Sequence, residues 1–214
     1  MRDYPMIWPI YKRVLLATMT LGSIVATTGV VHSQSWVTAK KCIRCDLTRA
    51  DLEYRNLQNI NFQGANFTFA NLQEVNFSGA NLSGTRLVEA KLARSNLSNA
   101  NLDAANIVKS DLHDTVFLRA SLESARVLQT NLRGAAFIGA KMRGINFADS
   151  NLKNADFRNS DLFAANFANT DCRDVDFGGA NLQGANFSGA KLDGVNFNGA
   201  NLKNITLPVG FRFP

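Results

Sequence analysis

The sequence is poor in the residues from which most catalytic and metal sites are built. It has two histidines and three cysteines, and His113 is the only histidine after residue 33. A zinc site takes four ligands, and beyond the pair Cys42 and Cys45 this part of the chain offers only His113 and the distant Cys172. A glycine-rich phosphate loop is also lacking. We therefore expect no enzyme, no bound metal and no cofactor.

The two common hydrophobic periodicities are missing as well. Apolar residues recur neither every 3.6 positions, as on a helix, nor every second position, as on a strand. They recur at every fifth position from Leu47 to Leu207, which gives 33 sites in one frame. All are Leu, Phe, Ile, Val or Met except Cys172. Two positions earlier stands a small or β-branched residue, with Arg55 as the bulky exception, and the residue between is most often Asn or Asp.

This five-residue frame predicts a chain that turns a corner after each unit. The central residue and the residue two positions before it point inward, as strand alternation requires, and the last two residues make the turn. Fixed self-similarity of this kind is typical of a solenoid, in which each repeat buries its apolar face by stacking on its neighbours. We therefore expect one elongated domain with a thin core.

Units such as Ala65–Phe69, Ala80–Gly84 and Ala185–Gly189 resemble those of the pentapeptide-repeat family. The resemblance implies an all-β fold, a right-handed quadrilateral β-helix in which four of the five-residue units make one coil. Over residues 46–207 this amounts to about eight coils, and with ~4.8 Å between stacked strands they form a rod of roughly 40 Å.

Sorting the central residues by steps of four units brings like side chains together, which independently favours a four-sided coil. One column consists of Leu52, Leu72, Leu92, Leu112, Leu132, Leu152, Cys172 and Leu192. The column that we expect to face it holds Phe117, Phe137, Phe157, Phe177 and Phe197.

Residues 1–33 have a different composition. Lys12 and Arg13 precede an 18-residue stretch without charge, residues 14–31, and residues 31–33 suit cleavage by a signal peptidase. This layout is typical of an export signal. A retained membrane anchor, formed by an N-terminal hydrophobic helix, is the first alternative. A helix that caps the domain is the second. We expect export to the periplasm or the thylakoid lumen, with membrane association through residues 14–31 if they are retained.

Residues 34–45 are expected to form a linker and an N-terminal cap that contains Cys42 and Cys45. Haem attachment needs histidine at the next position, where Asp46 stands. A thioredoxin-type motif needs a strand-to-helix setting, which this sequence lacks. In the five-residue frame both cysteines fall on inward positions. A disulfide would then pin the open end of the coil in an oxidising compartment. Two buried free thiols, or a catalytic or metal role, are the alternatives. Similar cysteine pairs are, as the resemblance implies, a feature of exported cyanobacterial members.

Apolar residues at outward positions give a candidate interaction surface. Val88, Val108 and Leu128 align on one face, and Leu118 and Ile138 on the opposite face. Aligned outward apolar residues about 5 Å apart merge into a patch, which suits docking or dimerisation. Ordinary tolerance of apolar residues at a surface is the alternative.

A second stripe carries one cationic or titratable residue per coil: His113, Arg133, Lys153 and Arg173. Aligned cations favour an anionic partner. However, Asp111, Asp114, Asp171 and Asp174 lie near the ends of the stripe. We therefore favour a self-neutralised, solvated face.

Residues 208–214 break the frame and are expected to cap the C-terminal end. Pro208 cannot donate to a ladder of backbone hydrogen bonds. Phe211 and Phe213 are expected to fold over the last coil and cover an edge that would otherwise recruit another strand.

These patterns predict a non-enzymatic structural or protein-interaction rod that acts outside the cytoplasm, as a monomer or as an end-to-end or side-by-side dimer. The alternative is a mimic of DNA that binds topoisomerases, as in some family relatives, which are implied to be acidic and cytoplasmic. Loss of residues 1–33 leaves 20 basic and 16 acidic residues. This weak positive charge does not fit the mimic, and it is too small to predict a nucleic-acid partner.

Overall fold

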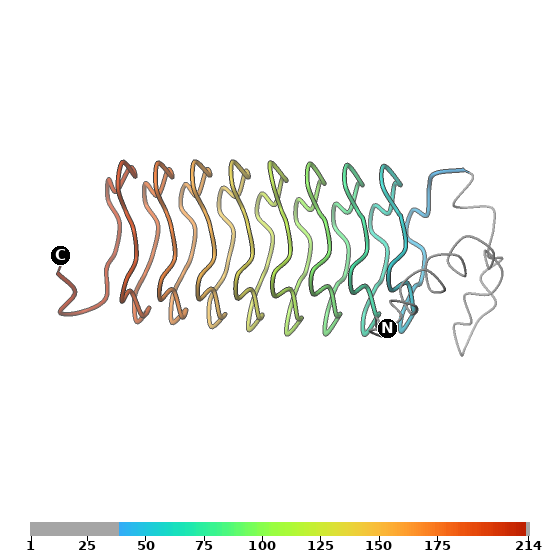
Figure 1. Ribbon diagram of the computed structural model, residues 1–214, viewed down its shortest axis with the longest axis horizontal. Helices are drawn as coiled ribbons and strands as arrows, with labels where there is room; N and C mark the ends of the chain where they lie inside the picture. The colour runs from blue at the N-terminus through green and yellow to red at the C-terminus, as the bar shows by residue number, and fades with distance from the viewer. Residues whose placement is uncertain (1–38, 213–214) are drawn as a thin grey trace, which may run out of the picture.

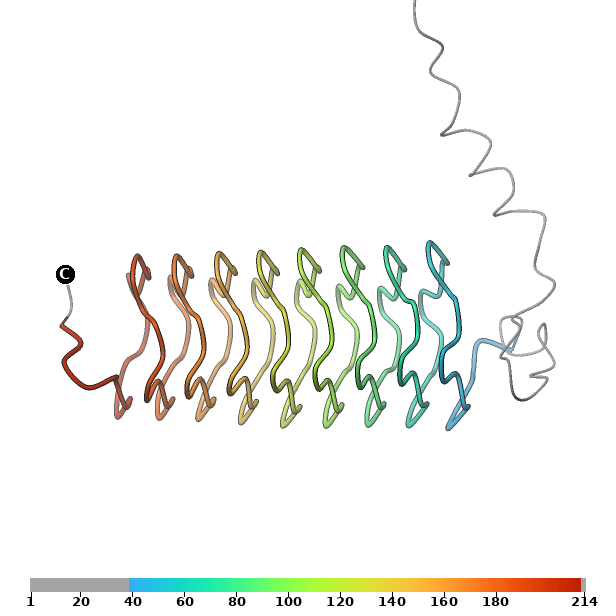
Figure 2. The ribbon, with the colours of Figure 1, turned by 90° about the horizontal axis from the view of Figure 1, so that it is seen from below.

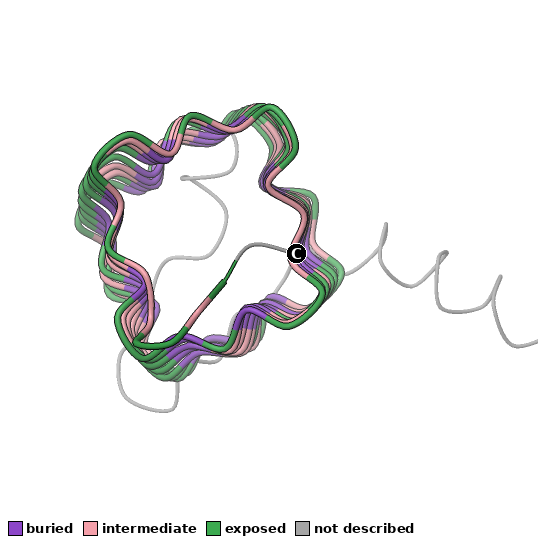
Figure 3. Cartoon of the chain, turned by 90° about the vertical axis from the view of Figure 1, so that its left-hand side faces the viewer, coloured by how far each residue is buried: buried purple, intermediate pink, exposed green. Residues whose placement is uncertain are grey.

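Residues 39–212 form a four-sided rod in the computed structural model that describes them. The coils stack along one axis (Figures 1 and 2), and four walls surround a shared interior (Figure 3). Parallel bridges join equivalent residues of successive coils, from Lys41 with Asn61 to Asn186 with Thr206. Each wall contributes one bridge residue per coil, and residues 39–212 contain no helix and no longer strand. The coil of four units that the family resemblance implies, and that the columns of like side chains favour, is therefore confirmed.

Each wall recurs once per coil, and we name it by one of its first central residues. They are the Leu47, Leu52, Leu57 and Phe62 walls. The central residues from Leu47 to Leu192 are all buried, whereas the residues on either side of them face outward. Central residues of the last coil, such as Phe197 and Leu202, are only half-buried. A coil at the end of a stack has a neighbour on one side alone, so its core is less completely covered.

Like side chains do stack on like, but one expected relation between columns is wrong. Phe137 and Phe157 stack with their ring centroids 4.7 Å apart and an angle of 5° between the rings. The column that faces them is not the leucine column of the Leu52 wall. It is the Phe147 column of the Leu47 wall, where Phe137 and Phe147 meet edge to face at 5.9 Å. Facing walls are half a coil, or two units, apart along the chain, while Leu152 and Phe157 lie on adjacent walls.

The outward Asn and Asp residues hold both the corner and the stack. The Asn151 side-chain oxygen accepts a hydrogen bond from the backbone N–H of Lys153 at 3.1 Å. Its amide nitrogen donates to the Asn131 side-chain oxygen one coil earlier, at 3.4 Å. Asparagine supplies both an acceptor and a donor, so one side chain can close the turn and continue the ladder. This dual role explains why Asn dominates the position before the central residue.

The second turn residue adopts a left-handed backbone conformation in most units. Gly134 has a φ of 71°, and a Cβ atom there would collide with the side chain of Asp114 in the coil before it. Glycine removes both the conformational strain and the collision at this corner. Elsewhere polar residues, and a few others such as Ala104, Tyr54 and Phe69, accept the strain because the paired coil fixes the turn.

Buried hydroxyls form a ladder that was not predicted from the sequence. Ser110, Thr130 and Ser150 occupy the same inward position in successive coils of the Leu52 wall. The Thr130 hydroxyl donates to the carbonyl oxygen of Ile107 at 2.9 Å, and the Ser150 hydroxyl donates to that of Val127 at 2.8 Å. The Ser110 hydroxyl donates in the same way to Leu87. No backbone N–H within residues 39–212 closes the turn onto the carbonyls of Ile107 and Val127. The hydroxyls of Thr130 and Ser150 therefore satisfy carbonyl groups that the turn leaves open.

Cys42 and Cys45 are joined by a disulfide in the first coil. Cys42 is buried, and Cys45 packs half-buried against the core. The N–H of Asn66 donates to the carbonyl oxygen of Cys45 at 2.9 Å, so the disulfide lies directly on the pairing between the first two coils. It closes the coil at the end where no earlier described coil pairs with it.

Residues 208–212 turn in over the open end of the last coil (Figure 3). Phe211 packs half-buried against the core, and its N–H donates to the carbonyl oxygen of Pro208 at 3.1 Å. Phe211 thus lies where the sequence predicts a covering residue. Phe213 and the hydrophobic helix expected within residues 14–31 lie outside the described residues 39–212.

The hydroxyl ladder yields the first prediction. Thr130→Val should lower the free energy of unfolding by about 1–3 kcal/mol, because a buried carbonyl group is left without a donor. Thr85→Val is the matched control. The carbonyl of Leu82 would lose the Thr85 hydroxyl, which donates to it at 2.7 Å. It would keep the backbone N–H of Thr85, which donates to it at 3.2 Å. Denaturant unfolding measures both variants. Equal losses would show that the Thr130 hydroxyl has no special role.

The disulfide yields the second prediction. Reduction should speed amide hydrogen exchange at Arg44 and Asn66, whose backbone bonds join the first two coils, because the end of the stack loses its constraint. Exchange at Asn146, five coils from Cys45, should be unchanged. Mass spectrometry or NMR resolves the two regions. Unaltered exchange at Asn66 after reduction would contradict a pinning role for the disulfide.

Candidate interaction surface

An apolar patch lies on the Leu57 wall in the middle of the rod. Leu118 is 38% exposed and Val116 is 39% exposed, and Ile138 follows one coil later, half-buried. Val116 bridges to Ala136, so the patch spans two adjacent coils. Leu118 and Ile138 were predicted from the sequence to share this face, whereas Val116 and Ala136 were not included in the surface. Both residues that flank a central residue face outward, which places all four on one face.

Val88, Val108 and Leu128 lie on the Leu47 wall, on the opposite side of the rod from Leu118. Each is half-buried, and they occupy three successive coils. The exposed residues Arg86 and Arg126 belong to the same wall. The two apolar surfaces are therefore separate and cannot contact one flat partner together.

The residues His113, Arg133, Lys153 and Arg173 lie on the Leu52 wall, and each has a carboxylate beside it. Nδ1 of His113 lies 2.9 Å from Asp111, and Arg173 lies 2.6 Å from Asp171. Arg133 and Lys153 each have an aspartate oxygen 3.9 Å away, from Asp114 and Asp174 respectively.

The pairing neutralises the stripe. The side-chain hydrogen bond from Arg173 lowers the pKa of Asp171 and, in turn, raises the pKa of Arg173. Both members of the pair stay charged at neutral pH. Exposed pairs of this kind add little stability, but they cancel the field that an anionic partner would meet.

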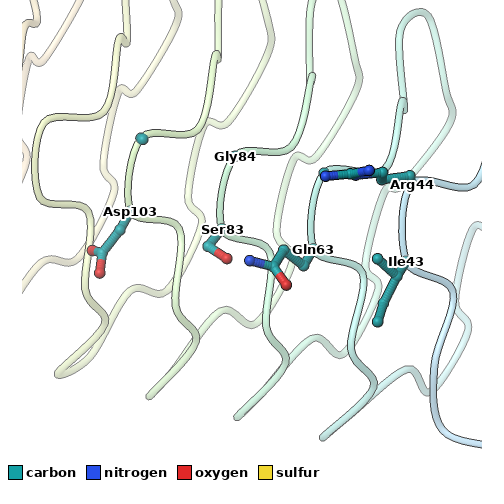
Figure 4. A pocket seen from close by; sticks show the side chains of 8 residues that line it. Ile43, Arg44, Gln63, Ser83, Gly84 and Asp103 are labelled. Atoms are coloured by element: carbon teal, nitrogen blue, oxygen red, sulfur yellow. The ribbon is translucent and has the colours of Figure 1, made fainter.

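A shallow groove runs along one corner of the Phe62 wall near the N-terminal end (Figure 4). Its volume is about 500 Å³, and it is lined by Ile43, Arg44, Gln63, Gly64, Ser83, Gly84, Asp103 and Ala104. The corner has no side chain at Gly64 and Gly84, which leaves the floor of the groove low. The Asp103 carboxylate accepts hydrogen bonds from the Ser121 hydroxyl and the Glu123 N–H, at 2.6 and 2.9 Å.

This groove was not predicted from the sequence. The signal was the recurrence of glycine at the same corner of successive coils, at positions 64 and 84. Active sites exclude water and bury titratable groups, and an open groove of this kind does neither.

The chemistry available within residues 39–212 is limited. No group of His, Cys, Asp or Glu there is arranged to hold a metal ion. No helix in the same range is long and apolar enough to cross a membrane. Cys172 is a free thiol in the leucine column, and burial raises its pKa to about 12. The thiol therefore stays protonated at neutral pH and is a poor nucleophile.

Two family models match the chain. Residues 45–84 and 80–117 match the model of pentapeptide repeats, and residues 130–207 match the model of a pentapeptide repeat region. No match was found among curated proteins.

Several solved structures are similar. HetL of Nostoc sp. strain PCC 7120, a pentapeptide repeat protein involved in heterocyst differentiation regulation, is 27% identical with a TM-score of 0.43. The match covers 81% of this chain and 89% of HetL. QnrB1, a plasmid-mediated fluoroquinolone resistance protein, is 20% identical with a TM-score of 0.41, over 78% of this chain and 79% of QnrB1.

A pentapeptide repeat protein from the Arabidopsis thaliana thylakoid lumen is 23% identical with a TM-score of 0.25, over 60% of this chain and 66% of that one. The family matches extend over nearly the whole stack of coils. The chain belongs to the pentapeptide repeat family, whose fold is the right-handed quadrilateral β-helix.

Proposed function

We propose that this protein is a non-enzymatic interaction rod that acts outside the cytoplasm and docks a protein through its Leu57 wall. The observation that carries the proposal is the apolar patch of Val116, Leu118, Ala136 and Ile138. The other coils of this wall present polar residues or glycine at the same two outward positions. The change in chemistry is confined to two adjacent coils, which is the extent of a local binding epitope rather than of a general drift in composition.

The patch is apolar, as the centre of a protein interface is. Such centres are surrounded by a polar rim, and arginine is enriched in interfaces. Arg119 stands at the corner beside Leu118, and Arg158 follows Ile138 in the next coil. Asp156 holds Arg158 through a hydrogen-bonded ion pair at 2.6 Å. A flat apolar centre with a charged rim suits a folded protein better than a small ligand, which needs a concave pocket.

A non-enzymatic role is supported by where the polar groups lie. The inward positions are filled by core side chains, and the carboxylates stand on the convex outside. There they close turns or pair with cations, as Asp156 and Asp171 do. This arrangement offers no enclosed space within residues 39–212 in which a catalytic group could be desolvated.

Action outside the cytoplasm, in the periplasm or the thylakoid lumen, is supported by two features. Lys12 and Arg13 precede the uncharged residues 14–31 in the order of an export signal. The disulfide between Cys42 and Cys45 suits an oxidising compartment. Cell fractionation tests this part, and recovery of the chain solely from the cytoplasm would contradict it.

A DNA-mimicking role gains no comparable support. The cations of the Leu52 wall are paired with carboxylates, and the chain as a whole has a net charge of +6. A mimic of a duplex needs a continuous negative surface.

The patch yields the third prediction. A photo-crosslinking amino acid at position 118, introduced in cells, should capture one partner protein. The same amino acid at Ser78, two coils away on the same wall, should not. In the chain that carries the crosslinker at position 118, Ile138→Ser should reduce the capture at least tenfold. Serine occupies this position at Ser78 and Ser98, so the coil accepts it. Leu128→Ser on the opposite wall is the matched control and should leave capture unchanged.

Equal capture from positions 118 and 78, or capture that is insensitive to Ile138→Ser, would contradict docking on the Leu57 wall. Circular dichroism of each variant confirms that the rod itself is intact. If a crosslinking amino acid at position 108 captured the partner instead, the docking surface would lie on the Leu47 wall.

A further inference from the structure

Three large apolar side chains are exposed together at the N-terminal end of the rod. Ile43, Tyr54 and Phe69 are 50%, 55% and 46% exposed, and all lie in the first two coils. Elsewhere in residues 39–212, the exposed large apolar side chains are Val116 and Leu118, which are less open at 39% and 38%, and Val209 near the C-terminal end. The N-terminal end is therefore a second place where the rod presents apolar surface to its surroundings.

These three residues do not share a wall. Ile43 belongs to the Phe62 wall, Tyr54 to the Leu52 wall and Phe69 to the Leu47 wall. A partner that lies along one wall would meet only one of them. A surface that meets the rod end-on, across its axis, would approach all three. Their placement around the perimeter of one end thus indicates a broad, flat partner.

Basic residues are concentrated at the same end. Residues 39–60 hold five basic side chains against three acidic ones: Lys40, Lys41, Arg44, Arg49 and Arg55 against Asp46, Asp51 and Glu53. The rest of the described chain, residues 61–212, holds 15 basic and 13 acidic side chains. The guanidinium of Arg49 lies 5.4 Å from the centre of the Phe69 ring. An aromatic ring beside a cation combines an apolar body with a charged head, as residues at a membrane interface do.

The chain enters the rod at this end from its most apolar stretch. The uncharged residues 14–31 finish ten positions before Lys41, a length of chain that spans at most roughly 36 Å. Residues 14–31 lie outside the described part of the chain, but the sequence itself fixes their distance along it. If residues 14–31 are held in a bilayer, the short connecting chain keeps the first coil close to the same bilayer.

We propose that the N-terminal end of the rod rests end-on against an anionic lipid surface. Ile43, Tyr54 and Phe69 enter the interfacial layer around the perimeter of the first coils. Lys40, Lys41, Arg44 and Arg49 face the lipid phosphates, since basic residues near a membrane are attracted to anionic headgroups. The rod then stands away from the membrane, with the Leu57 wall free along its side. This contact is separate from the protein docking on the Leu57 wall, and either one can fail without the other.

Spin labels on the full chain test the proposal. Tyr54→Cys and Phe69→Cys place a label at the membrane-facing end, and Leu118→Cys is the matched control because Leu118 is also an exposed apolar residue but lies in the middle of the rod. The native cysteines do not interfere, since Cys42 and Cys45 are paired and Cys172 is buried. Vesicles of phosphatidylglycerol and phosphatidylcholine are added, and label collisions with oxygen, which enters lipid, are compared with collisions with a water-soluble nickel chelate.

We expect the oxygen-to-nickel collision ratio to rise several-fold at positions 54 and 69 and to stay constant at 118. Vesicles of phosphatidylcholine alone, or Lys41→Gln combined with Arg44→Gln, should reduce the rise. If the chain floats with the vesicles while the labels at 54 and 69 remain as aqueous as the label at 118, only the upstream segment contacts lipid and the proposal is overturned. A full chain that does not float with anionic vesicles overturns it as well.

Discussion

Backbone pairing between successive coils is the constraint on which the rest of this structure depends. The N–H of Leu132 donates to the carbonyl oxygen of Asn151, and the N–H of Asn131 donates to that of Ser110, so each unit is tied to the coils on both sides. Because the units between the two end coils use their backbone in this way, side chains one coil apart are held in vertical register. Columns of phenylalanine then stack face to face, with the centroids of Phe147 and Phe167 5.4 Å apart. The hydrophobic core of the rod is a consequence of this register.

The same constraint separates structure from function. Inward positions are restricted by the narrow interior, where leucine, phenylalanine and small residues alternate. Outward positions are restricted only by the corner, which asks for Asn or Asp before the central residue and for a left-handed turn after it. Departures from that pattern, as at Val116 and Ala136, give up the side-chain hydrogen bonds of the corner but keep the backbone pairing between coils. They are therefore free to form a binding surface, and function in such a rod is expected to reside where the repeat is least regular.

Periodicity in the sequence was enough to predict which residues lie inside and which share a wall. It placed Leu118 and Ile138 opposite Val88, Val108 and Leu128, and it placed the two cysteines on inward positions. The assignment of the leucine and phenylalanine columns to facing walls was wrong. Sorting residues into columns does not show which walls meet across the interior. That relation follows only when two units are identified as half a coil.

Other features depend on details that the repeat does not contain. The hydroxyl of Thr130 donates to the carbonyl of Ile107, in the preceding coil, at a corner where the turn lacks its usual backbone donor. The groove beside Arg44 exists because side chains are missing from successive corners, and absence is harder to recognise in a sequence than a recurring residue. The exposed residues Ile43, Tyr54 and Phe69 lie on three walls, so their common end emerges only when the coils are assembled around one axis.

The register of four units per coil is tested most directly by distances along a single column. Pairs of spin labels joining the exposed position Gln58 to Arg158 or to Asn198 lie on one wall, separated by five and seven coils. We predict separations of roughly 24 and 34 Å along the axis, an increase of ~4.8 Å for each coil. Double electron–electron resonance measures both. Separations that fail to increase in proportion to the number of coils would contradict the four-sided coil and everything derived from it.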